Sequence, residues 1–511
     1  MTLEQICIII AIAIYLSAMI FIGFYFSKKG SAESGDDFYL GGRTLGPIVT
    51  AMSAEASDMS SWLLMGLPGL AYLSGIADAG WTAIGLAVGT YFNWLIVAKR
   101  LRNYSHVSDN AITIPSFFSA RYRDKFKILT CISAIFILIF FIPYTASGFK
   151  AIGTLFNSLF GFDYHVAMII GAIIIIGYTA LGGFLAVSVT DLVQSIVMSF
   201  ALILILFFAI SSAGGLDTVI TNSKALDGYL SMTHMHVDGA SVPYKFLSIA
   251  SALAWGLGYF GMPHILLRFM AISDASKLRT SRRIATIWVV ISMCAAIFIG
   301  IIGYSVSLNE KIQLFSSSSD SETIIIKLAE LLSKNGVILA LFAGIVIAGI
   351  IASTMSTSDS QLLTAASSVS ENLIQDFFRI KLDAKKSMVV ARSTVVIIAA
   401  ISVILAWNPN SSVFQIVSFA WAGFGAVFGP VMLFALFWKR SNIAGAFAGM
   451  LSGGIMVFVW KFLVKPLGGA FGIYELLPSF IVASIVIVIV SLCTKAPSQE
   501  IYDEFDKVKA M

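Results

Sequence analysis

Long apolar stretches separated by short polar connections run through the whole 511-residue chain. Each stretch has close to the ~20 residues that an α-helix needs to cross about 30 Å of hydrocarbon. The pattern leaves no room for a sizeable soluble domain, so it predicts an all-α polytopic membrane protein with 13 transmembrane helices. The predicted spans lie near residues 5–26, 47–70, 76–98, 128–149, 164–183, 187–212, 244–267, 284–306, 337–360, 388–407, 412–438, 443–463 and 472–494.

The second run has apolar flanks but a polar centre, with Glu55 and Asp58 among alanines and serines. One ionised Asp at the bilayer centre costs on the order of 3 kcal/mol, so two acids three residues apart indicate a functional site. Serine hydroxyls and Pro68 favour a broken helix, and the backbone oxygens that a break frees suit a hard cation. The alternative is an ordinary helix whose polar face packs against its neighbours.

The seventh run is the second unusual one, because its helix is interrupted within eight residues by Gly256, Gly258, Gly261 and Pro263. Pro263 removes a backbone donor, and the glycines weaken a regular helix. Trp255 and Tyr259 supply rings that line whatever the break exposes. A glycine-packed helix interface is the alternative interpretation.

The ninth run ends in a dense series of hydroxyls at residues 352–360, which also contains Asp359. These hydroxyls either bond back to the preceding turn or, with Asp359, form an oxygen cage, which is the interpretation favoured here. In the fourth run Pro143 precedes Tyr144, an amphipathic ring at a kink. Asp191, near the start of the sixth run, either caps that helix or lies on a cation path, and both interpretations stay open.

Charges are sparse and unevenly placed. Charged residues make up 12% of the chain, against about a quarter in soluble domains, and the net charge is +5. With thirteen spans, 25 of the 33 Lys and Arg residues fall on one side of the membrane and 8 on the other, which predicts an external N-terminus and a cytoplasmic C-terminus. The expected environment is the lipid bilayer; neither nucleic acid nor an obligate protein partner is expected.

The two interrupted spans are five spans apart. Because five is odd, the second set of five enters the membrane from the opposite side, which predicts a 5+5 inverted repeat with a midplane site, as in secondary transporters. One transporter domain, 1–511, then comprises an accessory first helix and loop (1–46), a first five-helix repeat (47–212), a second inverted repeat (244–438), accessory helices (443–494) and a cytoplasmic tail (495–511).

The segment FYLGGRTLGPIVTAMSAEASDMSSWLLMGLPG closely resembles the matching stretch of bacterial sodium/proline symporters, members of the solute:sodium symporter family. The resemblance continues through AITIPSFF, GGFLAVSVTDLVQ, WGLGYFGMPHILLRFM, SFAWAGFGAVFGPV and TKAPS, so it covers essentially the whole chain. It implies a leucine-transporter-like fold, alternating access and a bacterial inner (plasma) membrane location. It also implies Na⁺ as the co-transported ion, no organic cofactor, no metal other than Na⁺ and no enzymatic activity.

The resemblance also implies roles for particular residues. It assigns sodium binding to backbone oxygens of the second span and hydroxyls of the ninth, namely Ala56, Met59, Ser353, Ser356 and Thr357. Substrate binding falls to Ser57, Tyr144, Trp255, Tyr259 and Pro263. Arg43 matches a mobile gating arginine. The candidate coupling and ion-path residues are Asp58, Ser60, Asp191, Asp359 and Glu55, of which Asp191 and Asp359 are a candidate second cation site.

Four positions depart from the family pattern. Glu55 and Ser61 replace glycines, Met262 replaces a glutamine, and Asp359 stands where a small polar residue is usual. The expected function is Na⁺-coupled uptake (symport) of L-proline or a closely related small amino acid. The alternative is a proton-coupled or dual-cation symporter of another small zwitterion or organic solute that uses Glu55. A transporter-like sensor, a channel and a membrane enzyme are disfavoured.

Overall fold

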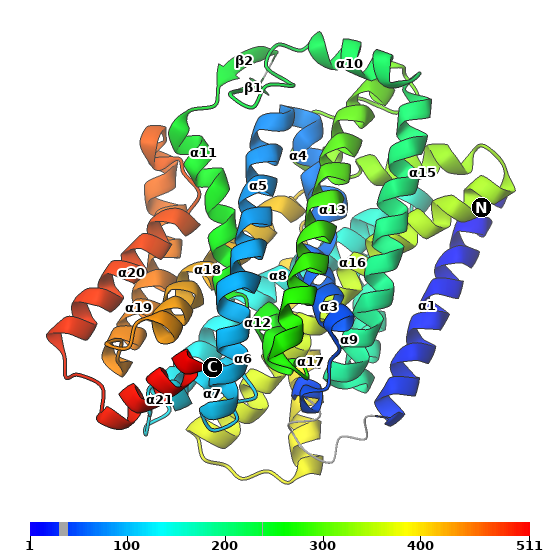
Figure 1. Ribbon diagram of the computed structural model, residues 1–511. Coiled ribbons are helices and arrows are strands. Elements are labelled where there is room, and N and C mark those ends of the chain that lie inside the picture. Colours follow the sequence, from blue (N-terminus) through cyan, green and yellow to red (C-terminus); the bar gives the residue numbers. More distant parts are fainter. Residues whose placement is uncertain (30–38, 238) are drawn as a thin grey trace.

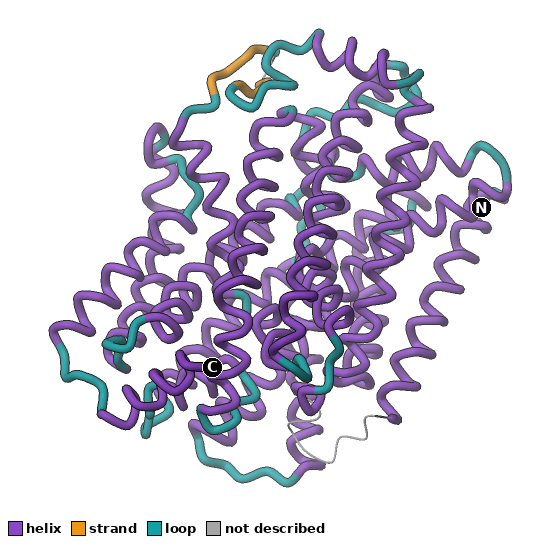
Figure 2. The backbone as a smooth tube through the Cα atoms, in the orientation of Figure 1, coloured by secondary structure: helices purple, strands orange, loops and turns teal. Residues whose placement is uncertain are grey.

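Helices account for nearly all of the chain, as Figures 1 and 2 show. The computed structural model describes residues 1–29, 39–237 and 239–511, so residues 30–38 of the predicted 1–46 segment lie outside the described residues. Among the described residues the strands form a single antiparallel hairpin of β1 (His234–Val237) and β2 (Ala240–Pro243), in which His234 pairs with Pro243.

The helical elements of the first half are α1 (Leu3–Lys29), η1 (Gly41–Arg43), α3 (Pro47–Ser61), η2 (Trp62–Gly66), α4 (Leu67–Ser74), α5 (Ile76–Phe92), η3 (Asn93–Val97), α6 (Ala98–Val107), α7 (Ile114–Arg121), α8 (Ile128–Phe160), α9 (Tyr164–Ser212) and α10 (Leu216–Lys224). Those of the second half are α11 (Phe246–Leu253), η4 (Ala254–Gly261), α12 (Pro263–Ala271), η5 (Ala275–Lys277), α13 (Leu278–Leu308), α14 (Ser318–Ser321), α15 (Ile324–Ser333), α16 (Val337–Ser367), η6 (Ser368–Phe377), α17 (Ala384–Leu405), α18 (Val413–Phe437), α19 (Ile443–Val459), η7 (Trp460–Val464), η8 (Lys465–Leu467), η9 (Gly469–Phe471), α20 (Leu476–Cys493) and α21 (Gln499–Ala510).

Ten helices in the described part of the chain are long and apolar enough to cross a membrane, and a bent pair raises that number to eleven. The bent pair is Phe246–Gly261 with Pro263–Ala271, at an angle of 49°. Two of the predicted spans are not among these long apolar helices, each for a different reason. The polar centre of α3 lowers the hydropathy of the second span, and Tyr164–Gly177 is a shorter apolar helix. The structure is therefore that of a polytopic helical membrane protein, while the number thirteen stays a prediction.

Three backbone breaks interrupt the helices. Ser60 takes φ 48° and ψ −172°, a conformation that residues other than glycine rarely adopt, and it ends the regular part of α3. Gly183, with φ 68°, breaks α9 at the predicted reversal between the fifth and sixth spans. Met262 is extended between η4 and α12, where Pro263 begins a new helix. Both interruptions predicted from sequence, in spans two and seven, are therefore present.

The broken elements lie inside the bundle. Helix α3 packs against α9, α12, α13 and α16, while η4 packs against α5 and α18. Helix α18 is the most enclosed of the candidate spans, whereas α1, α17 and α20 are peripheral and expose apolar side chains, as helices in contact with lipid do.

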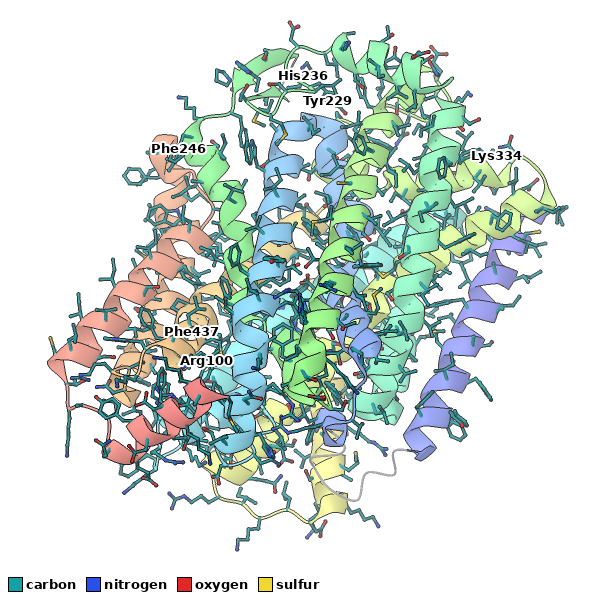
Figure 3. All side chains as sticks on the ribbon, viewed as in Figure 1. Arg100, Tyr229, His236, Phe246, Lys334 and Phe437 are labelled. Carbon is teal, nitrogen blue, oxygen red and sulfur yellow. The ribbon has the colours of Figure 1, made fainter. Side chains whose placement is uncertain are left out.

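The two ends of the bundle differ in their elements. Helix α10 and the hairpin lie at one end, and α6, α7 and α21 lie at the other with the C-terminus (Figure 1). Figure 3 places His236 and Tyr229 at the first end and Arg100 and Phe437 at the second. The Arg100 guanidinium there lies 5.1 Å from the centre of the Phe437 ring.

Candidate functional site

Asp58 is the point at which three elements meet. The Tyr259 hydroxyl, from η4, donates a 2.6 Å hydrogen bond to Asp58 Oδ2, and the Tyr144 hydroxyl, from α8, donates a 3.0 Å bond to the Asp58 carbonyl oxygen. The break at Ser60 follows at once, and Ser60 Oγ accepts a bond from the Trp62 backbone N–H at 3.1 Å. The structure therefore brings together Asp58, Ser60, Tyr144 and Tyr259, which the sequence placed on three separate spans.

The hydroxyl-rich part of α16 faces α3. Ser356 Oγ donates a 2.8 Å hydrogen bond to the carbonyl oxygen of Ala56 and Ser353 Oγ donates to the carbonyl oxygen of Ile350 at 2.8 Å. Thr357 Oγ1 is buried and has no partner among the described residues. Carbonyl and hydroxyl oxygens are the ligands that a hard cation prefers, and this contact places such oxygens on two helices side by side. The back-bonding interpretation also holds, since Ser353 uses its hydroxyl within its own helix.

A small cavity adjoins Asp58. It measures about 10 Å³, which leaves room for about one water molecule. Its lining comprises Asp58, Met59, Trp62, Leu86, Tyr144, Trp255, Val417 and Trp421. Amino acids are far larger than water, so binding one beside Asp58 requires these side chains to move.

A much larger cavity of about 610 Å³ lies beyond an aromatic layer. Trp255 lines both cavities, and its ring centre lies 5.6 Å from that of Trp62, 5.4 Å from that of Phe414 and 4.9 Å from that of Tyr474. Asp78 and Lys465 contribute opposite charges to the wall of the large cavity. The aromatic layer therefore separates a wide vestibule, lined by both polar and apolar side chains, from the small space beside Asp58.

Three of the predicted substrate residues, Ser57, Tyr259 and Pro263, are not among those that line the small cavity. Tyr259 is linked to the lining by its hydrogen bond to Asp58. Ser57 donates a 3.0 Å hydrogen bond to the Ala54 carbonyl oxygen within α3, and Pro263 is buried at the start of α12. Their geometry is that of residues that shape the helix breaks.

Arg43 joins the ends of several elements. Its guanidinium donates to the carbonyl oxygens of Met270 (2.6 Å) and Ala111 (2.9 Å) and to side-chain oxygens of Ser105 and Asn110 (3.2 Å each). Since Met270 belongs to α12, these bonds tie the entry of α3 to the end of the seventh span. Any motion that separates the two must break them.

Asp191 has a basic partner that sequence reasoning missed. Arg268 Nη2 lies 3.2 Å from Asp191 Oδ2, and both side chains are fully buried. Asp191 Oδ2 also accepts a 2.7 Å bond from Ser53 Oγ, and Arg268 donates to Ser53 Oγ and to Ser360 Oγ. In the sequence Arg268 ends an apolar run, so it was interpreted only as one of the 25 basic residues on the cytoplasmic side.

Asp359, the other half of the predicted second cation site, has a different partner. The Thr179 hydroxyl donates to its Oδ1, and its Oδ2 has no partner among the described residues. Ser360, the residue after Asp359, accepts a hydrogen bond from Arg268, which also pairs with Asp191. A cation site between the two acids would therefore have to accommodate a guanidinium.

Comparison with known proteins places this architecture in a family. The model of the sodium:solute symporter family matches residues 38–453. The chain is 42% identical over 498 residues to the osmoregulated proline transporter OpuE of Bacillus subtilis (strain 168), covering 98% of this chain and 97% of that one. It is also 42% identical over 504 residues to the sodium/proline symporter of Escherichia coli (strain K12), covering 98% and 96%. The chain belongs to the sodium:solute symporter family.

Solved structures support the fold of this symporter. A Na⁺-coupled sialic acid symporter in a substrate-bound outward-open state matches with a TM-score of 0.79 at 17% identity, covering 96% of this chain and 99% of that one. A nucleobase-cation-symport-1 family transporter, closed around bromovinylhydantoin, matches with a TM-score of 0.55 at 14% identity, covering 92% and 98%. The shared fold confirms the expectation of a transporter architecture, and the family is one of symporters rather than enzymes.

Glu55, where the symporter departs from the resemblance, is fully buried on α3. Its Oε1 accepts a 2.9 Å hydrogen bond from Trp94 Nε1, and its Oε2 has no partner among the described residues. Sequence reasoning identified Glu55 but missed Trp94 and its neighbours Thr90 and Asn93 on α5 and η3. The signal available in the sequence was the pair of polar residues Thr90 and Asn93, three positions apart in an otherwise apolar helix.

Proposed function

We propose that this symporter carries out Na⁺-coupled secondary active uptake of L-proline, or a closely related small amino acid, across a bacterial plasma membrane. The observation that carries the proposal is 40–42% identity, over 98% of the chain, to bacterial proteins named sodium/proline symporters. In this proposal Na⁺ is cargo that drives uptake, and no organic cofactor takes part. The lipid bilayer is the surrounding medium, and neither nucleic acid nor an obligate protein partner has a role.

The sodium ion is held between α3 and α16 in this proposal. Backbone oxygens of Ala56 and Met59 and hydroxyls of Ser353, Ser356 and Thr357 are its ligands. The 2.8 Å bond from Ser356 to the Ala56 carbonyl oxygen supports it, because it places two of these oxygens in contact, and Thr357 Oγ1 has no described partner. Asp58 and Ser60, at the break, link the ion to the substrate.

The substrate is held on the other side of the same break. Tyr144, Trp255 and Tyr259 provide rings and hydroxyls, and Ser57 and Pro263 set the shape of the interrupted helices. Since the cavity beside Asp58 has room for about one water, the amino acid enters from the large vestibule after Trp255 and its aromatic neighbours separate. Arg43 acts as a gate at the opposite end, where its bonds to Met270 and Ala111 must open to release cargo.

The finer architecture is part of the proposal. Thirteen transmembrane helices, an external N-terminus and a cytoplasmic C-terminus follow the distribution of Lys and Arg. Residues 47–212 and 244–438 form the two inverted repeats, each beginning with an interrupted helix. Residues 1–46 and 443–494 are accessory and 495–511 form the cytoplasmic tail. The breaks at Ser60 and Met262, at the start of the two repeats, support this division.

Uptake into proteoliposomes tests the function. Purified protein takes up labelled proline faster under an inward Na⁺ gradient than under an equal K⁺ gradient, and a sodium ionophore abolishes the difference. A panel of unlabelled amino acids in the same assay identifies the preferred substrate. Equal uptake under the two gradients would sink the proposal.

Glu55 favours a second candidate, a proton-coupled or dual-cation symporter of another small zwitterion or organic solute. The supporting observation is that its Oε2 has no partner among the described residues. Uptake driven by a pH gradient in Na⁺-free buffer, and lost in Glu55→Gln, distinguishes proton coupling from the first candidate.

A further inference from the structure

Two buried carboxylates on α3 lack a basic partner. Glu55 and Asp58 are 1% and 5% exposed, and neither forms an ion pair with a Lys, Arg or His of the described residues. Three residues apart on a helix, they face the same side. Each receives one side-chain hydrogen bond, from Trp94 and Tyr259 respectively. The donors that they have are neutral, so nothing in this part of the described structure offsets two negative charges.

Unpartnered oxygens gather around these acids. Glu55 Oε2, Asp58 Oδ1, Thr90 Oγ1 and Asn93 Oδ1 are all buried without a hydrogen-bond partner among the described residues. The Tyr259 hydroxyl lies among them, since it donates to Asp58, has the Thr90 side chain as a neighbour and is within electrostatic reach of Glu55. Asn93 lies next to this group, because its Nδ2 donates to the backbone carbonyl oxygen of Tyr259 at 3.1 Å and the residue after it, Trp94, donates to Glu55.

The chemistry of this set is that of a cation site. Carboxylate and amide oxygens only accept hydrogen bonds, and a threonine hydroxyl has lone pairs to offer. Asn93 uses its amide hydrogens on Tyr259, so its oxygen remains for another partner. Four buried acceptors of which two are acidic leave a large desolvation cost unless a cation joins them. Oxygen ligands of this kind suit a hard cation, and the cation that this family co-transports is Na⁺.

We propose that Glu55, Asp58, Thr90 and Asn93 form a Na⁺ site between α3 and α5, separate from the oxygens shared by α3 and α16. The two sites use different faces of the same interrupted helix, since Ala56 meets α16 while Glu55 meets Trp94 of η3. The inference rests on the proposed function, because it takes Na⁺ as the coupling ion. The symporter then binds one Na⁺ more than the α3–α16 oxygens alone hold.

The test is the stoichiometry of ²²Na⁺ binding to the full-length protein in detergent, without proline. Wild type is compared with Glu55→Gln, which keeps the size of the side chain and an acceptor for Trp94 but removes the charge. Glu55→Gln is expected to bind one Na⁺ fewer per chain. The matched control is Glu330→Gln, a partly exposed glutamate that pairs with Lys327 and Lys334 and is expected to bind as many as wild type.

Asn93→Leu provides a second variant that does not alter charge. It removes one neutral ligand, so the second Na⁺ is expected to bind about tenfold more weakly, at unchanged maximal binding. Thr90→Val is expected to act in the same direction. These variants keep the inference testable if Glu55→Gln fails to fold, which size-exclusion chromatography reveals.

Two results would overturn the inference. One is unchanged stoichiometry in folded Glu55→Gln together with unchanged affinity in Asn93→Leu. The other is uptake driven by a pH gradient that is lost in Glu55→Gln while ²²Na⁺ stoichiometry stays the same, which assigns a proton to the site. Failure of the proposed function is read separately, from wild-type proline uptake that ignores the Na⁺ gradient.

Discussion

Two sets of carboxylates are buried against α3, and among the described residues one set has a basic partner and the other has none. Asp191 is bound by the guanidinium of Arg268 and the hydroxyl of Ser53, whereas Glu55 and Asp58 receive single neutral donors. A buried ion pair supplies its own counter-charge, so Asp191 needs no bound cation to offset its charge. The Glu55–Asp58 pair lacks such a charge. The contrast separates a carboxylate that the fold itself compensates from two carboxylates for which we propose a bound cation.

Breaking the compensated set has the largest expected effect. Arg268→Met leaves Asp191 buried and unpaired, which destabilises a protein by about 3–5 kcal/mol. We expect the apparent unfolding temperature in detergent to fall by several degrees in Na⁺-free buffer. The double variant Arg268→Met/Asp191→Asn removes both charges and should recover much of the loss. Equal unfolding temperatures for the single variant and wild type would contradict a structural role for this pair.

The uncompensated set predicts a stabilisation by Na⁺ itself. An ion that binds only the folded state at 100 times its dissociation constant adds about 2.7 kcal/mol of stability. Wild type should therefore unfold at a higher temperature in NaCl than in KCl of equal ionic strength. Glu55→Gln should retain only part of that difference, since the proposed α3–α16 site is left intact. Identical curves in the two salts would count against Na⁺ binding at either site.

Tyr259 tests the difference between the two sets of carboxylates because its hydroxyl donates a hydrogen bond to Asp58, in the set without a basic partner. Tyr259→Phe removes a 2.6 Å bond to a carboxylate, and bonds to charged groups contribute about 1.5–3 kcal/mol. The Na⁺ concentration for half-maximal proline uptake should shift by about tenfold or more. The matched variant Tyr144→Phe removes a 3.0 Å bond to the neutral carbonyl of the same Asp58 and should shift it about fivefold. A larger effect for Tyr144→Phe would reverse this ranking of the two donors.

Much of the fold and of the site around Asp58 was predictable from the sequence, for physical reasons. Pro263 and the glycines before it cannot continue a helix, and a serine-rich centre with two acids is too polar for an ordinary span. Both breaks were therefore predicted correctly. The polarity of the second and ninth spans was visible in the sequence, but their pairing, like the roles of Tyr144 and Tyr259, came from the resemblance to a known family.

For other parts of the site the sequence showed that residues were polar or charged but not which groups they meet. Arg268 ends an apolar run, where a topology charge and a buried counter-ion look the same in sequence. Thr90, Asn93 and Trp94 lie on a span whose apolar pattern does not indicate which neighbour each face meets. The orientation of this span is seen only in the structure, where α5 crosses η4. The two elements are so close that a Cβ added to Gly256 would lie 2.2 Å from the Gly85 carbonyl oxygen. The structure identifies fewer membrane-spanning helices than the thirteen predicted, partly because the polar centre of α3 lowers the hydropathy of that helix.

The smallest expected effect concerns Trp94, the donor to Glu55. Trp94→Phe removes one hydrogen bond and leaves Glu55 Oε1 buried without a partner, which costs about 1–2 kcal/mol of stability in Na⁺-free buffer. Saturating Na⁺ should shrink that loss, because the ion then supplies the interaction that the indole provided. The control is Trp288→Phe, which removes a 2.8 Å bond to the Ser199 hydroxyl away from both carboxylate sets and should cost the same in either buffer. If both variants respond to Na⁺ alike, Glu55 does not sense the ion and the distinction between the two carboxylate sets fails.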